Sequence, residues 1–166
     1  MMHKQPEARG RQKASALNYA VRLLAMRPYS ERKLREKLLA RQYESREIRE
    51  ALVRLKRENF LNDRRYCEDY IRIQVRARPR AATRMVSDLL ARGIPLTLAK
   101  EVVAELLPKT DELALATEFV RRKLAQYARL DDATRWRRLA GPLARRGFSY
   151  HTIRQVLGKS LEQVSD

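Results

Sequence analysis

Hydrophobic residues recur along most of this 166-residue chain at intervals of three and four, with polar and charged residues between them. Leu17, Val21 and Leu24, for example, share one face of a predicted helix. The same spacing returns in nearly every segment up to Leu157, whereas the alternation typical of a β-strand is scarce. We therefore predict an all-α protein of about nine short helices.

The stretch 60–72 marks a joint between two helical units. Asn62 or Asp63 can cap a new helix, because a side-chain oxygen there accepts hydrogen bonds from the free amides of the first turn. Phe60 and Leu61 precede this cap, where they can form a hydrophobic staple. Four residues at helical spacing form the face predicted to be buried: Tyr66, Tyr70, Ile73 and Ala77.

Caps and prolines mark further helix ends. Pro28 is expected to end the first helix near Arg27, because the residue before a proline disfavours the helical conformation. Ser30 and Ser45 are the predicted N-caps of the next two helices. Pro142 has no amide hydrogen to donate, so we expect it to kink or restart the eighth helix.

Three similar segments about fifty residues apart predict a tandem repeat. Each contains a helix end rich in Leu, Ala and Arg, followed by a large apolar residue: Tyr43, Ile94 or Phe148. Gly93 and Gly147 suit the left-handed backbone that ends a helix, and Gln42 holds that position in the first copy. We predict three tandem three-helix repeats in an elongated array that can curve.

The predicted organisation follows from these repeats. A disordered basic tail is expected at residues 1–14 and a C-terminal tail at residues 161–166. The three repeats are assigned to residues 15–59, 60–108 and 109–160. Units of about 45–50 residues are small to stand alone, so each repeat is expected to gain stability from its neighbour.

The chain is strongly basic, with 37 Lys and Arg against 20 Asp and Glu, a formal net charge of +17 and a pI near 10.7. Such a charge favours a polyanionic partner, either DNA, RNA or an acidic protein face. The simpler alternative is a solvated helical surface that happens to be basic.

Little in the sequence indicates catalysis or a bound cofactor. Cys67 is the only cysteine, which excludes an internal disulfide and a cysteine zinc site, and we expect it to be buried and inert. His3 and His151 lack metal-ligand spacing, and no Gly-rich phosphate loop follows a strand. We expect neither an enzyme nor a cofactor or metal site. The absence of a signal peptide or an apolar membrane span predicts a cytoplasmic protein.

Basic residues form two regions suited to a polyanion. In the first, Arg76, Arg78 and Arg80 surround Pro79 in a predicted turn, where guanidinium groups can reach outward to phosphates. The second region lies between Phe119 and Lys159. The candidate binding residues are Arg72, Arg76, Arg78, Arg80, Arg84, Arg121, Arg122, Lys123, Arg137, Arg138, Arg145 and Arg146.

Three aromatic residues are interleaved with these charges: Tyr127, Trp136 and Tyr150. Trp136 fits an apolar stripe, which favours packing in the core. Stacking on nucleic-acid bases is the alternative role for the three rings.

Three segments resemble the RecX family, the bacterial regulators of RecA recombinase. The first runs from Ala-Val-Arg-Leu-Leu-Ala-Met-Arg-Pro-Tyr-Ser at 20–30 into Leu-Arg-Glu-Lys-Leu at 34–38. The others are Phe-Leu-Asn-Asp-Arg-Arg-Tyr at 60–66 and Arg-Arg-Gly-Phe-Ser-Tyr at 145–150. The chain departs from the family pattern at Cys67, where a small residue is more usual, and at Gly141-Pro142.

The resemblance implies an all-helical array of three three-helix repeats that binds the RecA–DNA filament. Such a protein would lie in the groove of the filament and suppress ATP hydrolysis, strand exchange and co-protease activity, thereby affecting DNA repair and recombination. Its implied partners are the RecA filament and single-stranded DNA, with duplex DNA as a second ligand. The chain is expected to be a monomer without a membrane partner, and the family has no catalytic residues to transfer.

Two other functions are open at this point. Residues 30–55 can be read as a helix-turn-helix, which would make the chain a DNA-binding regulator that acts without RecA. Glu44, Glu47 and Glu50 near the start of the would-be recognition helix speak against this, because they would meet an anionic groove. The third function is a scaffold that binds an acidic protein and no nucleic acid.

Overall fold

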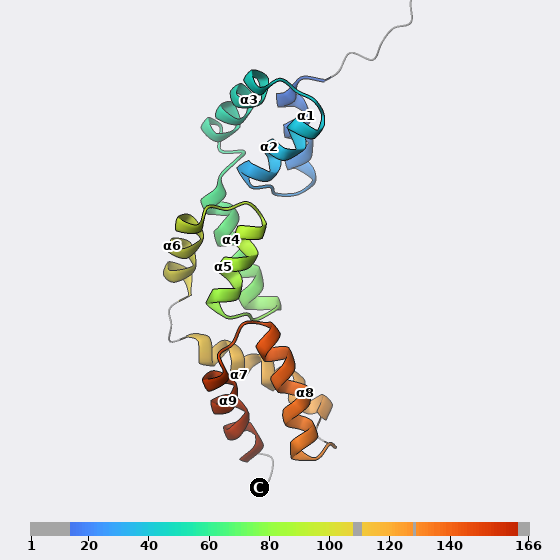
Figure 1. The fold of residues 1–166 in the computed structure, drawn as a ribbon, viewed down its shortest axis with the longest axis vertical. Coiled ribbons are helices and arrows are strands. Elements are labelled where there is room, and N and C mark those ends of the chain that lie inside the picture. Colours follow the sequence, from blue (N-terminus) through green and yellow to red (C-terminus); the bar gives the residue numbers. More distant parts are fainter. Residues whose placement is uncertain (1–13, 108–110, 128, 163–166) are drawn as a thin grey trace, which may run out of the picture. The chain divides into compact units, whose positions relative to one another are not determined.

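The computed structural model describes residues 14–107, 111–127 and 129–162. Within these ranges the chain forms nine α-helices and one short 3₁₀ helix, without a β-strand (Figure 1), which confirms the predicted all-α class. No helix in this part of the chain is long and apolar enough to cross a bilayer. The predicted tails at residues 1–14 and 161–166 lie almost wholly outside the described residues.

The helices divide between two compact units, of which the first ends at Leu61 and the second begins at Asn62. The first unit contains α1 (Ala16–Met26), α2 (Glu31–Ala40) and α3 (Ser45–Arg57). The second contains α4 (Asp63–Ala77), α5 (Ala82–Ala91), α6 (Leu96–Leu106), α7 (Asp111–Leu124), the 3₁₀ helix η1 (Ala125–Tyr127), α8 (Asp132–Arg145) and α9 (Tyr150–Glu162).

The first unit packs its three helices around one hydrophobic core. Fully buried leucines and isoleucine from α2 and α3 form its centre: Leu34, Leu38, Ile48, Leu52 and Leu55. Leu61 closes this core after α3, whereas Phe60 is 61% exposed, so only one of the two predicted staple residues is buried.

The second unit also has a single core, although it contains two of the three-helix groups. Ile71, Met85 and Val102 from α4, α5 and α6 belong to the same buried cluster as Leu139 and Leu157 from α8 and α9. The second and third three-helix groups therefore share apolar surface.

The same helix ending recurs in all three groups and supports the repeat. Gln42, Gly93 and Gly147 each have a positive φ, of 58°, 87° and 84°. The next residue in each copy turns inward, is buried, and donates its amide to the carbonyl five residues earlier: Tyr43 to Leu38, Ile94 to Leu89 and Phe148 to Leu143, at 3.1–3.4 Å. This is the Schellman motif, which satisfies the last free carbonyls of a helix.

Most of the predicted N-caps are confirmed, but one is wrong. The side chains of Ser30 and Asn62 accept hydrogen bonds from the backbone amides of the first helical turn. Helix α3 is instead capped by Glu44, one residue before the predicted Ser45, in a reciprocal capping box with Glu47. Glutamate is uncommon as an N-cap, so the sequence favoured the serine.

The interiors of α4 and α8 differ in part from the prediction. In α4, Ile73 is 61% exposed and Ala77 is exposed, because the buried face is formed by Cys67, Tyr70, Ile71 and Gln74. Helix α8 does not restart at Pro142 but continues through it to Arg145. The proline removes one helical hydrogen bond, while Leu139 and Leu143 anchor the helix in the core on both sides of it.

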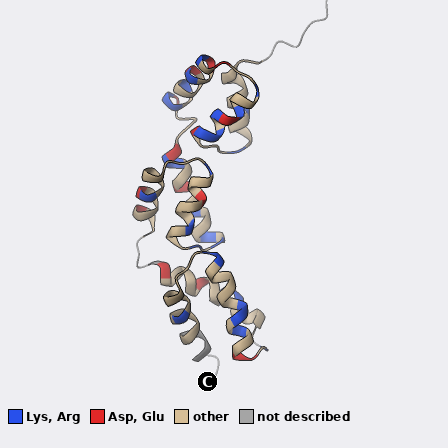
Figure 2. Ribbon diagram, viewed as in Figure 1, with Lys and Arg blue, Asp and Glu red and all other residues tan. Residues whose placement is uncertain are grey.

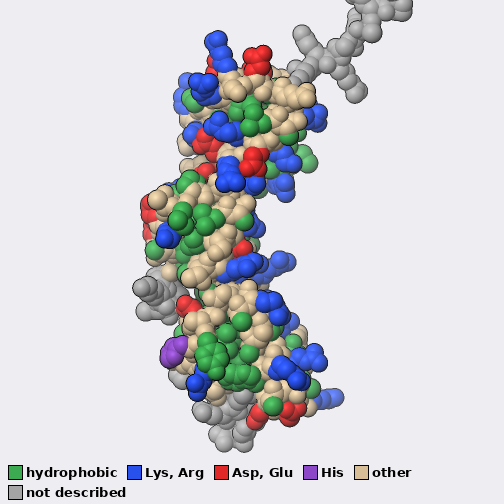
Figure 3. All heavy atoms as spheres, viewed as in Figure 1, with side chains coloured by type: hydrophobic (Ala, Val, Ile, Leu, Met, Phe, Trp, Pro, Cys, Tyr) green, Lys and Arg blue, Asp and Glu red, His purple; other side chains and the backbone are tan. Residues whose placement is uncertain are grey.

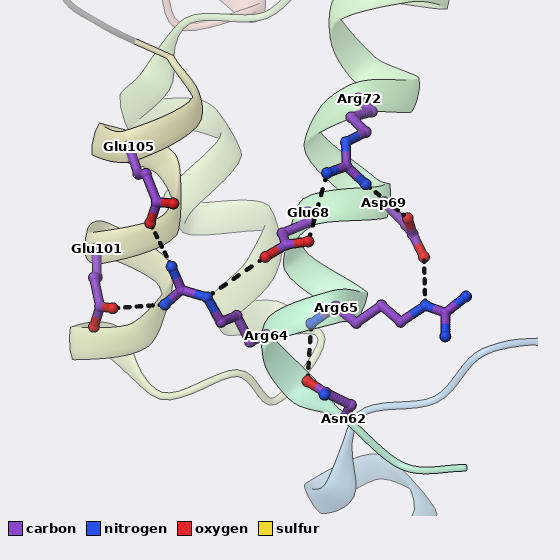
Figure 4. A network of polar contacts seen from close by, with 8 residues as sticks. All are labelled: Asn62, Arg64, Arg65, Glu68, Asp69, Arg72, Glu101 and Glu105. Carbon is purple, nitrogen blue, oxygen red and sulfur yellow. Dashed lines mark hydrogen bonds and ion pairs between the residues drawn. The ribbon is translucent and has the colours of Figure 1, made fainter. Parts of the chain in front are cut away.

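A polar clamp joins α4 to α6 (Figure 4). The guanidinium of Arg64 binds Glu101 at 2.6 Å and also pairs with Glu105, both on α6. Its Nε lies 3.5 Å from Glu68 on its own helix. All four groups are substantially exposed, so the clamp orients the helices more than it stabilises them.

Candidate nucleic-acid interface

Within the second unit, the turn between α4 and α5 lies against the turn between α8 and α9. The backbone amide of Ala81 donates to the carbonyl of Arg146 at 3.0 Å, and the Thr83 hydroxyl donates to the carbonyl of Gly147 at 3.5 Å. A Cβ on Gly147 would lie only 2.8 Å from the Cβ of Arg84. Glycine suits this position for two reasons: it adopts the positive φ without strain, and it has no Cβ to block the close approach of Arg84.

Arg146 is fixed at this contact by two interactions. Its guanidinium lies over the ring of Phe119, 4.3 Å from the centroid, and its Nη1 donates to the carbonyl of Pro142 at 3.2 Å. Burial lowers the pKa of Arg146, and the nearby charges of Arg80, Arg145 and Arg78 lower it further. The guanidinium groups of Arg80, Arg145 and Arg78 are therefore close enough to Arg146 to disfavour its charge.

We define the junction cluster as Arg76, Arg78, Arg80, Arg84, Arg145 and Arg146. Figure 2 shows Lys and Arg positions on the ribbon where the end of α4 and the start of α5 approach the end of α8. The Arg122 Nη1 also donates to the carbonyl of Arg76 at 3.1 Å, which ties α7 to the end of α4. Residues from both basic regions of the sequence thus meet at one place.

Asp88 is the carboxylate that faces this cluster, and its oxygens are already occupied. It pairs with Arg80, forms an ion pair with the Arg84 Nε at 3.2 Å, and accepts a hydrogen bond from the Tyr70 hydroxyl at 2.9 Å. The expectation that Arg80 reaches outward is therefore wrong, because its side chain is bound to a carboxylate that is only 12% exposed. The spacing of Arg84 and Asp88, one helical turn apart, is the sequence signal for this pair.

Arg76, Arg78 and Arg145 are exposed, and among the described residues none of them forms an ion pair. The Arg145 Nη1 lies over Gly141, 3.4 Å from where a Cβ would stand. These three side chains are the part of the junction cluster that remains open to a ligand.

The other candidate residues lie outside the junction cluster. Arg72 pairs with Glu68 and Asp69 on its own helix. Arg121 and Arg122 both bind Glu118, and these hydrogen bonds lower the pKa of that carboxyl to about 2. Lys123 Nζ donates to Gln126 at 3.2 Å, and Arg137 and Arg138 are exposed on α8. Figure 3 shows basic side chains over the start of α5 and along α8.

The three aromatic candidates differ in exposure. Tyr127 and Trp136 are half-buried against the core of the second unit, as predicted for Trp136. Tyr150 is 72% exposed, and the guanidinium of Arg154 lies 6.0 Å from its ring centroid. Only Tyr150 of the three presents most of its ring to solvent.

Cys67 is buried, as predicted, and burial raises the pKa of its thiol to about 11. A thiol with such a pKa is protonated and unreactive at neutral pH. The described residues contain no group of three or more His, Cys, Asp or Glu that could hold a metal ion.

Comparison with known proteins shows the family to which the chain belongs. The family model described as "RecX, first three-helix domain" matches residues 16–55, and "RecX, third three-helix domain" matches residues 110–157. The regulatory protein RecX of Trichlorobacter lovleyi is 35% identical over 141 residues, which cover 84% of this chain and 92% of the relative. The chain belongs to the RecX family.

Further relatives and a solved structure agree with this assignment. The regulatory protein RecX of Thermus thermophilus is 40% identical over 123 residues, which cover 74% of this chain and 78% of the relative. The crystal structure of RecX from Lactobacillus salivarius has a TM-score of 0.72 at 18% identity, and the match covers 87% of this chain and 93% of that one. That structure supports the fold of three-helix repeats.

The relatives carry the name of a regulatory protein, and this RecX-family chain is accordingly a regulatory protein and not an enzyme. Within it, Arg145 and Arg146 lie in the region matched as the third three-helix domain. Arg76, Arg78 and Arg80 lie between the two matched regions. The junction cluster therefore combines arginines from the third domain with arginines from the segment before it.

Proposed function

We propose that this chain binds the RecA–DNA filament and modulates RecA, mainly by inhibiting its recombinase, ATPase and co-protease activities. Membership of the RecX family and the net charge of +17 support this proposal. The observation that carries it is the junction cluster of six arginines, of which only Arg80 and Arg84 pair with a carboxylate, that of Asp88, among the described residues. A filament that contains DNA offers the negative charge that this surface lacks.

We also propose the partners of the chain and its location in the cell. The partners are the RecA filament and single-stranded DNA, with duplex DNA as a second ligand, and the chain acts as a monomer. A regulator of this kind works where the chromosome lies, in the cytoplasm, and so acts on DNA repair and recombination.

The test is the DNA-dependent ATPase rate of RecA on single-stranded DNA, with this protein added well below one copy per RecA monomer. We expect strong inhibition at those ratios, because a protein that acts on the assembled filament affects many RecA subunits at once. An unchanged ATPase rate, together with intact DNA binding, would overturn the proposal.

The alternative of a helix-turn-helix regulator predicts a different result, namely a footprint on one preferred duplex sequence without RecA. In the structure, Glu44 and Glu47 form the capping box of α3 and Glu50 pairs with Arg46 at 2.9 Å. Three carboxylates at the start of the would-be recognition helix are poorly suited to the major groove.

A further inference from the structure

We propose that the junction cluster is a binding site for the phosphodiester backbone of single-stranded DNA, with Arg76, Arg78 and Arg145 as its contact residues. The inference rests on the proposed function and assigns one of its two partners to a defined place. RecA would then be contacted by other parts of the surface.

The charge balance of the junction cluster favours an anionic ligand. Asp88 binds Arg80 and Arg84, and the remaining arginines of the cluster have no carboxylate partner within the described residues. Like charges held together destabilise a fold unless a ligand neutralises them. Bound phosphates would remove this repulsion, and an arginine fork matches the geometry of two phosphate oxygens.

The junction cluster is also preorganised for binding. The two turns that carry the cluster are joined by the hydrogen bond from Ala81 to Arg146 and by the contact between Gly147 and Arg84. Arg146 is itself fixed over Phe119. The backbones of the contact residues are therefore already in place before the ligand arrives, which lowers the entropy cost of binding.

An exposed aromatic ring close in sequence to the junction cluster favours single-stranded nucleic acid over other polyanions. Tyr150, the first residue of α9, follows Arg146 by one short turn, and its ring is 72% exposed beside Arg154. Exposed aromatic rings beside arginines are how proteins bind single-stranded nucleic acids, because unpaired bases can stack on them. An acidic protein face would make no use of this ring, and the paired bases of a duplex are not free to stack on it.

The experiment measures binding of a fluorescently labelled oligothymidine of about 20 nucleotides by anisotropy, without RecA, at several salt concentrations. The test variant is Arg78→Glu with Arg145→Glu. The matched control is Arg22→Glu with Arg49→Glu, two exposed arginines of the first unit that form no ion pair within the described residues. Both variants change the net charge equally.

We expect the junction variant to bind at least about tenfold more weakly, with a salt slope smaller in magnitude by about 1.4, which is about 0.7 for each lost phosphate contact. The control should lose much less affinity and keep the slope of the unaltered protein. Equal losses in both variants would overturn the proposal, since net charge alone would then explain binding. The pair Arg78→Gln and Arg145→Gln, which adds no negative charge, should show the same slope change.

Two further binding measurements distinguish single-stranded DNA from duplex DNA and from an acidic protein. A duplex of the same length should bind more weakly than the single strand. If the duplex binds as tightly as the single strand, and the junction variant loses as much affinity for the duplex as for the single strand, the single-strand assignment is wrong. Polyglutamate at matched charge should compete poorly. Effective competition by polyglutamate would show a site for acidic protein and would also overturn the proposal.

The ATPase assay separates this inference from the proposed function. A junction variant that binds DNA normally, while the unaltered protein inhibits RecA, refutes the site and leaves the function intact. If the junction variant no longer binds single-stranded DNA, while the unaltered protein does not change the ATPase rate of RecA, the site is supported and the proposed function is refuted.

Discussion

The backbone amide of Ala81 donates a 3.0 Å hydrogen bond to the carbonyl oxygen of Arg146, and so joins a turn of the second three-helix group to a turn of the third. The two groups also share one hydrophobic core. Because backbone atoms form this bond, substitutions of the surrounding side chains can change the charge of the junction without removing the link.

Gly147→Ala should destabilise the protein by about 1–3 kcal/mol, because an alanine there adopts a left-handed φ of 84° and its Cβ meets that of Arg84. Gly158→Ala is the matched control, since nothing lies within 4 Å of its Cβ position in α9. That change should stabilise by about 0.5–1 kcal/mol. Urea unfolding followed by circular dichroism measures both, and equal effects would contradict the assigned close approach.

Charge reversal at neighbouring arginines should have different effects on stability. Arg80→Glu places a second carboxylate against Asp88 and should cost about 2 kcal/mol, whereas Arg78→Glu should change the stability by less than about 0.5 kcal/mol. Thermal unfolding at low salt compares the two. If Arg78→Glu is as destabilising as Arg80→Glu, the description of Arg78 as unpaired is wrong.

Stability should fall at high pH, partly through Tyr70. Burial first, and then its hydrogen bond to Asp88, raise the pKa of the Tyr70 hydroxyl from 10.0 to about 12. Between these values the unfolded chain loses this proton while the folded protein keeps it, so the free energy of unfolding decreases as pH rises.

Tyr70→Phe should therefore lower stability by about 1 kcal/mol at pH 8, through the lost hydrogen bond, and the difference from the unaltered protein should shrink above pH 10. Urea titrations from pH 8 to 11.5 measure this. Cys67, whose thiol titrates near pH 11, is present in both proteins and cancels in the comparison. A difference that stays constant over this range would refute the raised pKa.

Tyr150→Ala should weaken binding of single-stranded DNA by about 1–3 kcal/mol and leave duplex binding nearly unchanged, because only unpaired bases can stack on the ring. Tyr150→Trp should retain the affinity. His151→Ala, at the adjacent exposed position, is the control and should bind as the unaltered protein does. Equal weakening by Tyr150→Ala and His151→Ala would exclude a stacking role.

The sequence alone determined the helical class, the repeat and most helix ends. Ser30 and Asn62 cap their helices as predicted, and Gln42 takes the left-handed position that glycine holds in the other copies. These features are local, because a cap or a Schellman motif involves residues within about one or two turns of each other. Composition likewise indicated a polyanionic partner, since net charge does not depend on the fold.

Tertiary structure decided which residues meet. Ile73 fits a helical face by spacing, yet packing of α5 and α6 buries Ile71 and Gln74 instead. The sequence alone could not separate Arg78, whose side chain is exposed and unpaired among the described residues, from Arg80, which is bound to Asp88. Nor could the sequence show that Arg78 and Arg80 lie near Arg146, because that proximity arises from backbone contacts between turns far apart in the sequence. Helical periodicity reports a side chain's direction within its helix, and only the packing of helices fixes its neighbours.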